Sequence, residues 1–86
     1  MASYNIFFKR SAEKELRKIS KPHLVQIIDK IKSLSHNPKP HGVQMLRGEG
    51  RYLRLRQGDY RIVYEVDDAD RTVTIIKVGH RREVYD

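Results

Sequence analysis

The sequence predicts a small α+β protein in which a twisted, mostly antiparallel sheet carries an N-terminal helical hairpin on one face. Two segments near the N-terminus repeat apolar residues at helical spacing, and residues 52–78 show the alternation that is typical of strands. A short strand precedes the helices, so the expected order is strand, helix, helix and a three-strand meander. A chain of 86 residues suits one domain, which we expect to span residues 1–86.

The first strand and the first helix are expected before residue 20. Residues 4–8 place apolar side chains on both faces of a strand. A helix should follow at about residues 11–19, with Ser11 as its candidate N-cap, because the hydroxyl can accept a free backbone N–H of the first turn. The apolar residues of this helix lie four and three positions apart: Ala12, Leu16 and Ile19.

A second, longer helix is expected to begin near Pro22, because proline is favoured in a first turn. It should end at Asn37, since the residue before a proline avoids the α region. Lys30 is expected on its outward face. The apolar positions repeat at helical spacing and predict a stripe against the sheet: Leu24, Ile27, Ile28, Ile31 and Leu34.

Residues 39–50 are expected to form a loop, because this segment holds Pro40 and three glycines. Met45 and Leu46 are expected to return from this loop to the core.

A polar turn is predicted at residues 67–70, where three aspartates do not match the ligand spacing of an EF-hand. The last strand should follow at residues 71–78. Two apolar residues, Val73 and Ile75, are expected on one face of it, and Ile76 and Val78 on the other.

The segment 52–64 predicts a β-hairpin with a defined register. Gly58 and Asp59 form a two-residue loop, in which glycine accepts the positive φ that such turns need. The expected cross-strand pairs are Gln57 with Tyr60, Arg56 with Arg61, Leu55 with Ile62, Arg54 with Val63, Leu53 with Tyr64 and Tyr52 with Glu65.

This register puts the apolar pairs on one face of the hairpin and Arg54, Arg56 and Arg61 on the other, open face. Like charges directly opposite each other are destabilising. Arg56 and Arg61 are therefore either splayed into solvent or held together to grip an anion, and we favour the anion site.

Composition supports a polyanionic partner. The formal net charge is +7 and the pI is near 9.9, which favours nucleic acid, an acidic protein, or both in turn. Seven lysines and two arginines precede Gln44, whereas eight arginines and one lysine follow it. Because arginine matches phosphate oxygens in pairs, the second half looks built to bind phosphate.

Several classes of function are excluded or disfavoured. The absence of cysteine excludes disulfides, thiolate chemistry and cysteine-ligated zinc. The sequence lacks a run long enough to span a membrane and an apolar N-terminal signal core, so we expect a cytoplasmic protein. No phosphate-cradling glycine motif is present.

Three pieces of the chain resemble the RelE/ParE superfamily of toxins from bacterial and archaeal toxin–antitoxin systems. They are YNIFFKRSAEKELRKI, LRGEGRYLRLRQGDYRIVY and VGHRREVY. The resemblance covers essentially the whole chain in order and implies the fold derived above. RelE-like members are mRNA endonucleases that act in the ribosomal A site, whereas ParE-like members inhibit DNA gyrase. The resemblance favours the RelE-like branch, with a ParE-like gyrase inhibitor as the alternative.

The resemblance also implies a set of site residues. Arg54 and Arg56 stand where RelE-like enzymes carry a strand lysine or arginine, and Arg61 matches the arginine of the returning strand. Arg81 and Tyr85 match an arginine and a tyrosine near the C-terminus. Two arginines of the preceding loop complete the phosphate-binding candidates: Arg47 and Arg51.

These residues suit RNA cleavage by attack of a 2′-OH on the adjacent phosphorus. Arg61 with Arg54 or Arg56 can clamp the phosphate, Arg81 can neutralise the leaving oxygen, and Tyr85 can stack on a base or orient the 2′-OH. Arginine is a poor base. The candidate base or acid is therefore His80, because imidazole is the side chain best suited to proton transfer near neutral pH, with Glu83 as another.

The resemblance implies the partners and the cofactor requirement as well. We expect mRNA and the ribosome as targets and no metal or other cofactor. A RelB-like antitoxin should cover the helices or the basic face with an acidic or amphipathic segment and form a hetero-oligomer with the toxin. A third hypothesis is a non-toxic module that only binds nucleic acid.

Overall fold

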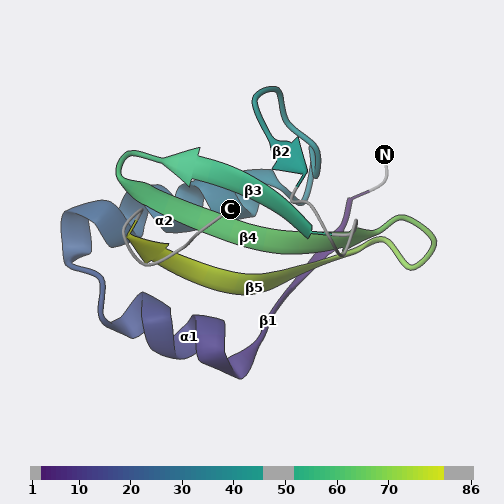
Figure 1. The fold of residues 1–86 in the computed structure, drawn as a ribbon. Coiled ribbons are helices and arrows are strands. Elements are labelled where there is room, and N and C mark those ends of the chain that lie inside the picture. Colours follow the sequence, from purple (N-terminus) through teal and green to yellow (C-terminus); the bar gives the residue numbers. More distant parts are fainter. Residues whose placement is uncertain (1–2, 46–51, 81–86) are drawn as a thin grey trace.

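A computed structural model of the protein describes residues 3–45 and 52–80 and confirms the α+β class (Figure 1). The elements in chain order are β1 (Asn5–Phe8), α1 (Arg10–Arg17), α2 (Lys21–Ser33), β2 (Gln44–Met45), β3 (Tyr52–Gln57), β4 (Tyr60–Asp67) and β5 (Thr72–His80). The strands form one sheet in the order β1-β5-β4-β3-β2, in which β1 runs parallel to β5 and the other neighbours are antiparallel.

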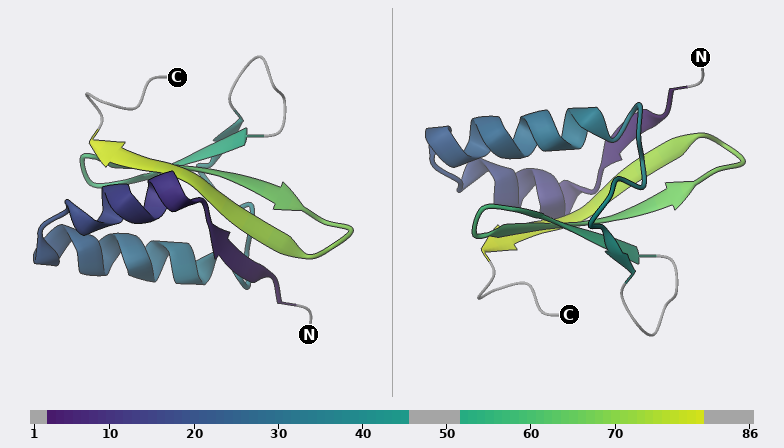
Figure 2. Two further views of the ribbon diagram at one scale, coloured as in Figure 1. Left: turned by 90° about the horizontal axis from the view of Figure 1, so that it is seen from below. Right: turned by 90° about the horizontal axis from the view of Figure 1, so that it is seen from above.

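Both helices lie on the same side of the twisted sheet (Figure 2). The core lies between the two layers, because the apolar stripes of the helices meet the apolar face of the strands. Its largest fully buried members come from α2, the residue after α2, and the strands β4 and β5: Ile27, Ile31, Leu34, Ile62, Tyr64, Val73, Ile75 and Val78. Within the described ranges, no helix is long and apolar enough to cross a membrane.

The hairpin of β3 and β4 has the register predicted from its two-residue loop. All six expected pairs are present, from Gln57 with Tyr60 to Tyr52 with Glu65. Gly58 has a φ of +62°, the left-handed conformation that an L side chain strains to adopt. The turn residue and the alternation of the strands therefore define which side chains face the helices.

A β-bulge between β4 and β5 overturns one prediction about the last strand. Tyr64 pairs with Ile75, but Val63 pairs with Lys77, so that Ile76 is an extra residue on β5. The extra residue reverses the alternation beyond it. Val78, predicted on the face opposite Ile75, is instead 1% exposed and belongs to the core.

The boundaries of the N-terminal elements correct the prediction of the first cap. α1 begins at Arg10, and Lys9 occupies the N-cap position without a side-chain hydrogen bond. Ser11 therefore lies inside the first turn and is not the cap. α1 ends at Arg17 and α2 ends at Ser33, each earlier than its apolar periodicity predicted.

The expected loop before β3 contains the short strand β2. Its residue Met45 pairs with Leu53 but is 66% exposed, so the prediction that Met45 returns to the core was wrong. The reason is that β2 is the outermost strand and has only two residues. Leu46 lies outside the described residues.

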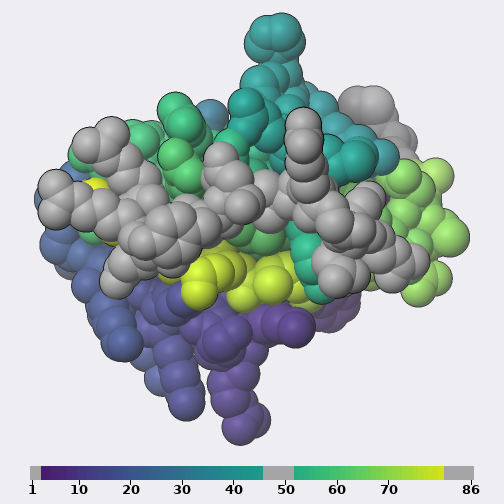
Figure 3. Space-filling view, in the orientation of Figure 1, coloured from purple at the N-terminus to yellow at the C-terminus, as the bar shows by residue number. Residues whose placement is uncertain are grey.

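β1 covers the first half of the β5 edge by pairing with it, and α1 covers the second half. α1, in purple-blue, lies directly against β5, in yellow (Figure 3). The Val78 backbone N–H donates a hydrogen bond of 2.9 Å to Glu15 Oε1, and Lys77 Nζ lies 3.7 Å from Glu15 Oε2. The Glu15 carboxylate thus binds a strand-edge N–H that would otherwise invite another chain.

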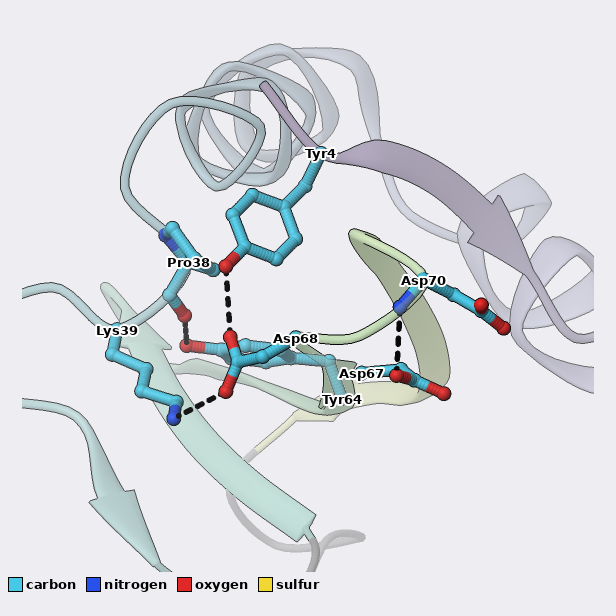
Figure 4. A network of polar contacts seen from close by, with 7 residues as sticks. All are labelled: Tyr4, Pro38, Lys39, Tyr64, Asp67, Asp68 and Asp70. Carbon is cyan, nitrogen blue, oxygen red and sulfur yellow. Dashed lines mark hydrogen bonds and ion pairs between the residues drawn. The ribbon is translucent and has the colours of Figure 1, made fainter. Parts of the chain in front are cut away.

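A polar network ties the start of β1 to the turn between β4 and β5 (Figure 4). The Tyr4 hydroxyl donates to Asp68 Oδ1 at 2.8 Å, and Lys39 Nζ lies 3.3 Å from Asp68 Oδ2. The hydrogen bonds from Tyr4 and Lys39 lower the pKa of the Asp68 carboxyl, and the bond to Asp68 raises the pKa of Tyr4. Asp67 Oδ1 accepts the Asp70 N–H at 3.0 Å, which confirms the predicted polar turn.

Tyr64 anchors β4 to the segment that follows α2. Its side chain is 0% exposed, and its hydroxyl donates to the Pro38 carbonyl oxygen at 2.7 Å (Figure 4). Burial raises the pKa of Tyr64 to about 12, so the hydroxyl keeps its proton at neutral pH.

Replacement Tyr64→Phe should lower the free energy of unfolding by about 1–2 kcal/mol, because it removes this hydrogen bond and leaves a carbonyl without its donor. Urea unfolding should show a lower midpoint with an unchanged m-value. The matched control is Tyr4→Phe, whose hydroxyl contact is exposed and should matter less. Equal midpoints for Tyr64→Phe and the parent protein would contradict the assigned anchor.

Candidate nucleic-acid interface

Three arginines from the hairpin lie on the sheet face that points away from the helices. Arg54 and Arg56 belong to β3, and Arg61 of β4 pairs directly with Arg56. Their neighbours in sequence, such as Leu55 and Ile62, point to the core, so strand alternation places the arginines on the opposite face. We call Arg54, Arg56 and Arg61 the arginine cluster.

The arginine cluster is less open than the sequence predicted. Arg54 is only 5% exposed, Arg61 is partly buried and Arg56 is exposed. The Nη2 of Arg54 donates a hydrogen bond to Oε1 of Gln44 on β2. Because β2 lies beside β3 and supplies this amide, the guanidinium of Arg54 is packed and oriented instead of solvated.

The positive charges of the cluster act on one another. Burial lowers the pKa of Arg54, and the charges of Arg61 and Arg56 lower it further. A phosphate group suits the cluster, because each guanidinium presents donors in a planar fork that matches two oxygens.

A small hollow of about 90 Å³ lies next to the cluster at the hairpin turn. It is lined by Arg56, Gly58, Asp59 and Arg61. Arg56 and Arg61 bring two positive charges to this hollow against the one negative charge of Asp59, and the absence of a side chain at Gly58 leaves room there for a small anion. We therefore place the candidate phosphate position at this hollow.

His80 lies on a different side of the sheet. It pairs with Tyr60, while its neighbour Gly79 pairs with Arg61. The ring centroids of His80 and Tyr60 are 5.6 Å apart, and Tyr60 also contacts His23 of α2 at 5.4 Å. The structure thus joins His80 to the helix side and does not bring it to the arginine cluster.

The other predicted site residues are not described by the structure. Arg47, Arg51, Arg81 and Tyr85 lie outside the described residues, as does Glu83. The structure therefore describes the candidate site at the arginine cluster and at the residues around it.

Gln44 is a site residue that the sequence reasoning missed. It falls in the segment predicted as a loop, and no periodicity marks it as a strand residue facing Arg54. Among residues 3–45 and 52–80, no three His, Asp or Glu side chains gather as a metal site requires.

Comparison with known proteins defines the class. Residues 6–85 match the family model described as "ParE toxin of type II toxin-antitoxin system, parDE". The chain is 30% identical to toxin RelG of Mycobacterium tuberculosis over 83 residues, which cover 95% of each protein.

Solved structures agree with this match. The chain superposes on the toxin–antitoxin complex RelBE2 from Mycobacterium tuberculosis with a TM-score of 0.83 and 30% identity, covering 93% of this chain and 100% of that one. The archaeal RelE–RelB complex from Pyrococcus horikoshii gives a TM-score of 0.82 and 28% identity, covering 95% and 99%.

The fold and the matches define a toxin of a type II toxin–antitoxin system. The chain belongs to the RelE/ParE superfamily of these toxins, and the RelG and RelE proteins cited above are its relatives.

Arg54 is expected to serve phosphate binding as well as packing, because Gln44 orients its guanidinium within the arginine cluster. Replacement Arg54→Met keeps part of the aliphatic stem but removes the guanidinium and leaves the Gln44 amide oxygen without its donor, so the melting temperature should fall modestly. Binding of single-stranded RNA should weaken, with a smaller dependence on salt. Arg17→Met on exposed α1 is the matched control for the loss of one charge. RNA affinity and salt dependence of Arg54→Met equal to those of Arg17→Met would contradict a binding role for Arg54.

Proposed function

We propose that the protein is an mRNA endonuclease that inhibits translation by cutting mRNA in the ribosomal A site. The observation that carries the proposal is the arginine cluster, with Arg54 buried beside Arg56 and Arg61 on one sheet face. Such a cluster can hold a phosphodiester and stabilise the charge that develops on it. The resemblance to RelE-like enzymes supplies the ribosome as the setting.

The reaction is an attack of the 2′-oxygen on the adjacent phosphorus. The bond from the 2′-oxygen to phosphorus forms, the bond from phosphorus to the 5′-oxygen breaks, and the products are a 2′,3′-cyclic phosphate and a 5′-hydroxyl. A base takes the proton of the 2′-OH, and an acid gives a proton to the 5′-oxygen. In the proposed mechanism Arg61 and Arg56 bind the non-bridging oxygens, where preorganised charge is usually the largest contribution.

The remaining roles follow from the resemblance. Arg81 neutralises the leaving 5′-oxygen, and Tyr85 stacks on a base or orients the 2′-OH. Arg47 and Arg51 bind phosphates of the flanking strand. The placement of His80 beside Tyr60 does not favour it as the base, which leaves Glu83 as the other candidate. Because arginines supply the charge, the proposed reaction needs no metal.

A cognate antitoxin is part of the proposal. The similar structures from Mycobacterium tuberculosis and Pyrococcus horikoshii are complexes of a toxin with an antitoxin. For this chain, we propose an acidic or amphipathic segment that covers the arginine cluster or the helices. A partner that binds only the folded state stabilises it by mass action.

Adding the product of the adjacent gene to the purified protein should therefore raise its melting temperature. Co-expression of the two genes should suppress the growth arrest that the toxin causes alone. Differential scanning fluorimetry and a co-expression growth assay measure the two effects. The control is the same gene product with its acidic residues changed to amides. No rise in melting temperature and undiminished arrest would contradict the proposed antitoxin.

Inhibition of DNA gyrase without nuclease activity is the second candidate, and the matching ParE family model favours it. It would require a protein surface that recognises gyrase, and the arginine cluster would then contact acidic side chains. A gyrase supercoiling assay with this toxin, run beside the nuclease assay, separates the two candidates.

The deciding experiment is primer extension on a defined mRNA, with and without programmed ribosomes. The protein should produce cuts only with ribosomes, and Arg61→Ala should slow cutting by about 100-fold or more. Arg17→Ala, on exposed α1, is the control and should cut normally. Undiminished cutting by Arg61→Ala would remove the cluster from the mechanism, and growth arrest without any cuts would favour gyrase.

A further inference from the structure

A second recess lies beside β3, between the segment that precedes and includes β2 and the arginines Arg54 and Arg56. Its volume is about 340 Å³. Its lining includes Lys30, His41, Gly42, Gln44, Arg54 and Arg56. In the described part of the chain β2 pairs with Leu53 and Arg54, so β2 does not cover the edge of β3 beyond Arg54, where Leu55 and Arg56 line the recess.

The recess is cationic. Lys30 comes from α2, where the sequence predicted an outward side chain, but it is partly buried and lines the recess. Arg54 and Arg56 enter from β3, and His41 from the loop after α2. Among the described residues that line this recess, none carries a carboxylate. Charges of one sign in a hollow attract an ion of the opposite sign.

Two further features suit the recess to a ligand. Gln44 must direct its amide oxygen to Arg54, because a guanidinium only donates hydrogen bonds, and this contact orients the buried cation. Gly42 has a φ of +92° and no atom within 4 Å of a Cβ built on it, so the backbone there borders open space. The recess therefore combines an oriented cation with room for a bulky anion.

We propose that this recess binds a second phosphate of the RNA strand, adjacent to the phosphate held by Arg56 and Arg61. This inference rests on the proposed function and defines the path of its substrate. Arg56 lines both the recess and the small hollow at the turn, so one strand can follow Arg61, Arg56 and Lys30 in order. Lys30 is then a binding residue far from the hairpin in sequence.

The continuity through Arg56 favours a nucleic-acid strand over an acidic protein segment. Both ligands carry negative charge, but a strand carries phosphates at regular intervals and would fill the two hollows together. An isolated carboxylate would need only one of them. Binding of an acidic protein segment, instead of RNA, is one of the outcomes that the experiment distinguishes.

The test measures binding of a fluorescent single-stranded RNA whose 2′-hydroxyls are methylated, so that cleavage is blocked. Fluorescence anisotropy at several salt concentrations gives the slope of log K against log salt. Lys30→Gln should reduce this slope by about 0.7, the value for one phosphate contact on a single strand. Lys32→Gln, on the same helix but outside the recess, is the matched control and should change it less.

A second set of RNAs, each with one phosphate replaced by a neutral methylphosphonate, locates the contact. The parent protein should lose affinity at two neighbouring positions, and Lys30→Gln should lose its sensitivity at one of them. Melting temperatures check that the variants fold, and Lys30→Met repeats the test with the aliphatic stem retained. Equal slopes for Lys30→Gln and Lys32→Gln, or no position with altered sensitivity, would overturn the proposal.

Three results separate this proposal from the proposed function. If Lys30→Gln binds RNA normally but loses affinity for the antitoxin, the recess belongs to the protein partner and the RNA subsite is wrong. If the phosphate pattern is found but no cleavage occurs on ribosomes, the subsite stands and the nuclease activity falls. Cleavage by the parent protein with an unchanged slope for Lys30→Gln removes the subsite alone.

Discussion

The pairing of Arg56 with Arg61 across a two-residue turn is the constraint on which the candidate site depends. Two like charges directly opposite each other are unfavourable, and the buried Arg54 beside them adds to the repulsion. The hairpin can hold them because its other face packs Leu53, Leu55, Ile62 and Tyr64 into the core. Burial of the apolar face thus holds in place a charge arrangement that is suited to an anion.

The rest of the fold keeps that hairpin in position. α1 and Glu15 cover the edge of β5, Tyr64 ties β4 to the Pro38 carbonyl, and Gln44 on β2 orients Arg54. The helices occupy one face of the sheet (Figure 2), and strand alternation places the arginine cluster on the opposite face. The apolar face of the sheet thus supplies the core, and the arginine face carries the candidate site.

Local rules predicted the parts of the fold that local geometry decides. The turn at Gly58 and the alternation of β3 were enough to give every pair of the hairpin. The misplaced residues depend on contacts that are distant in sequence. The bulge at Ile76 turned Val78 to the core, and the edge position of β2 left Met45 exposed. Arg54 was predicted on an open face because the sequence does not show that Gln44 lies against it.

The central claim, that the arginine cluster binds phosphate, can be measured on the side chains themselves. NMR signals of the arginine Nε–Hε groups should be followed while a non-cleavable RNA trinucleotide is added. The Nε–Hε signals of Arg54, Arg56 and Arg61 should shift together and saturate together, while that of Arg17 on α1 stays in place. Shifts confined to Arg17 and other helix residues, with the cluster unmoved, would contradict the assignment of this sheet face to nucleic acid.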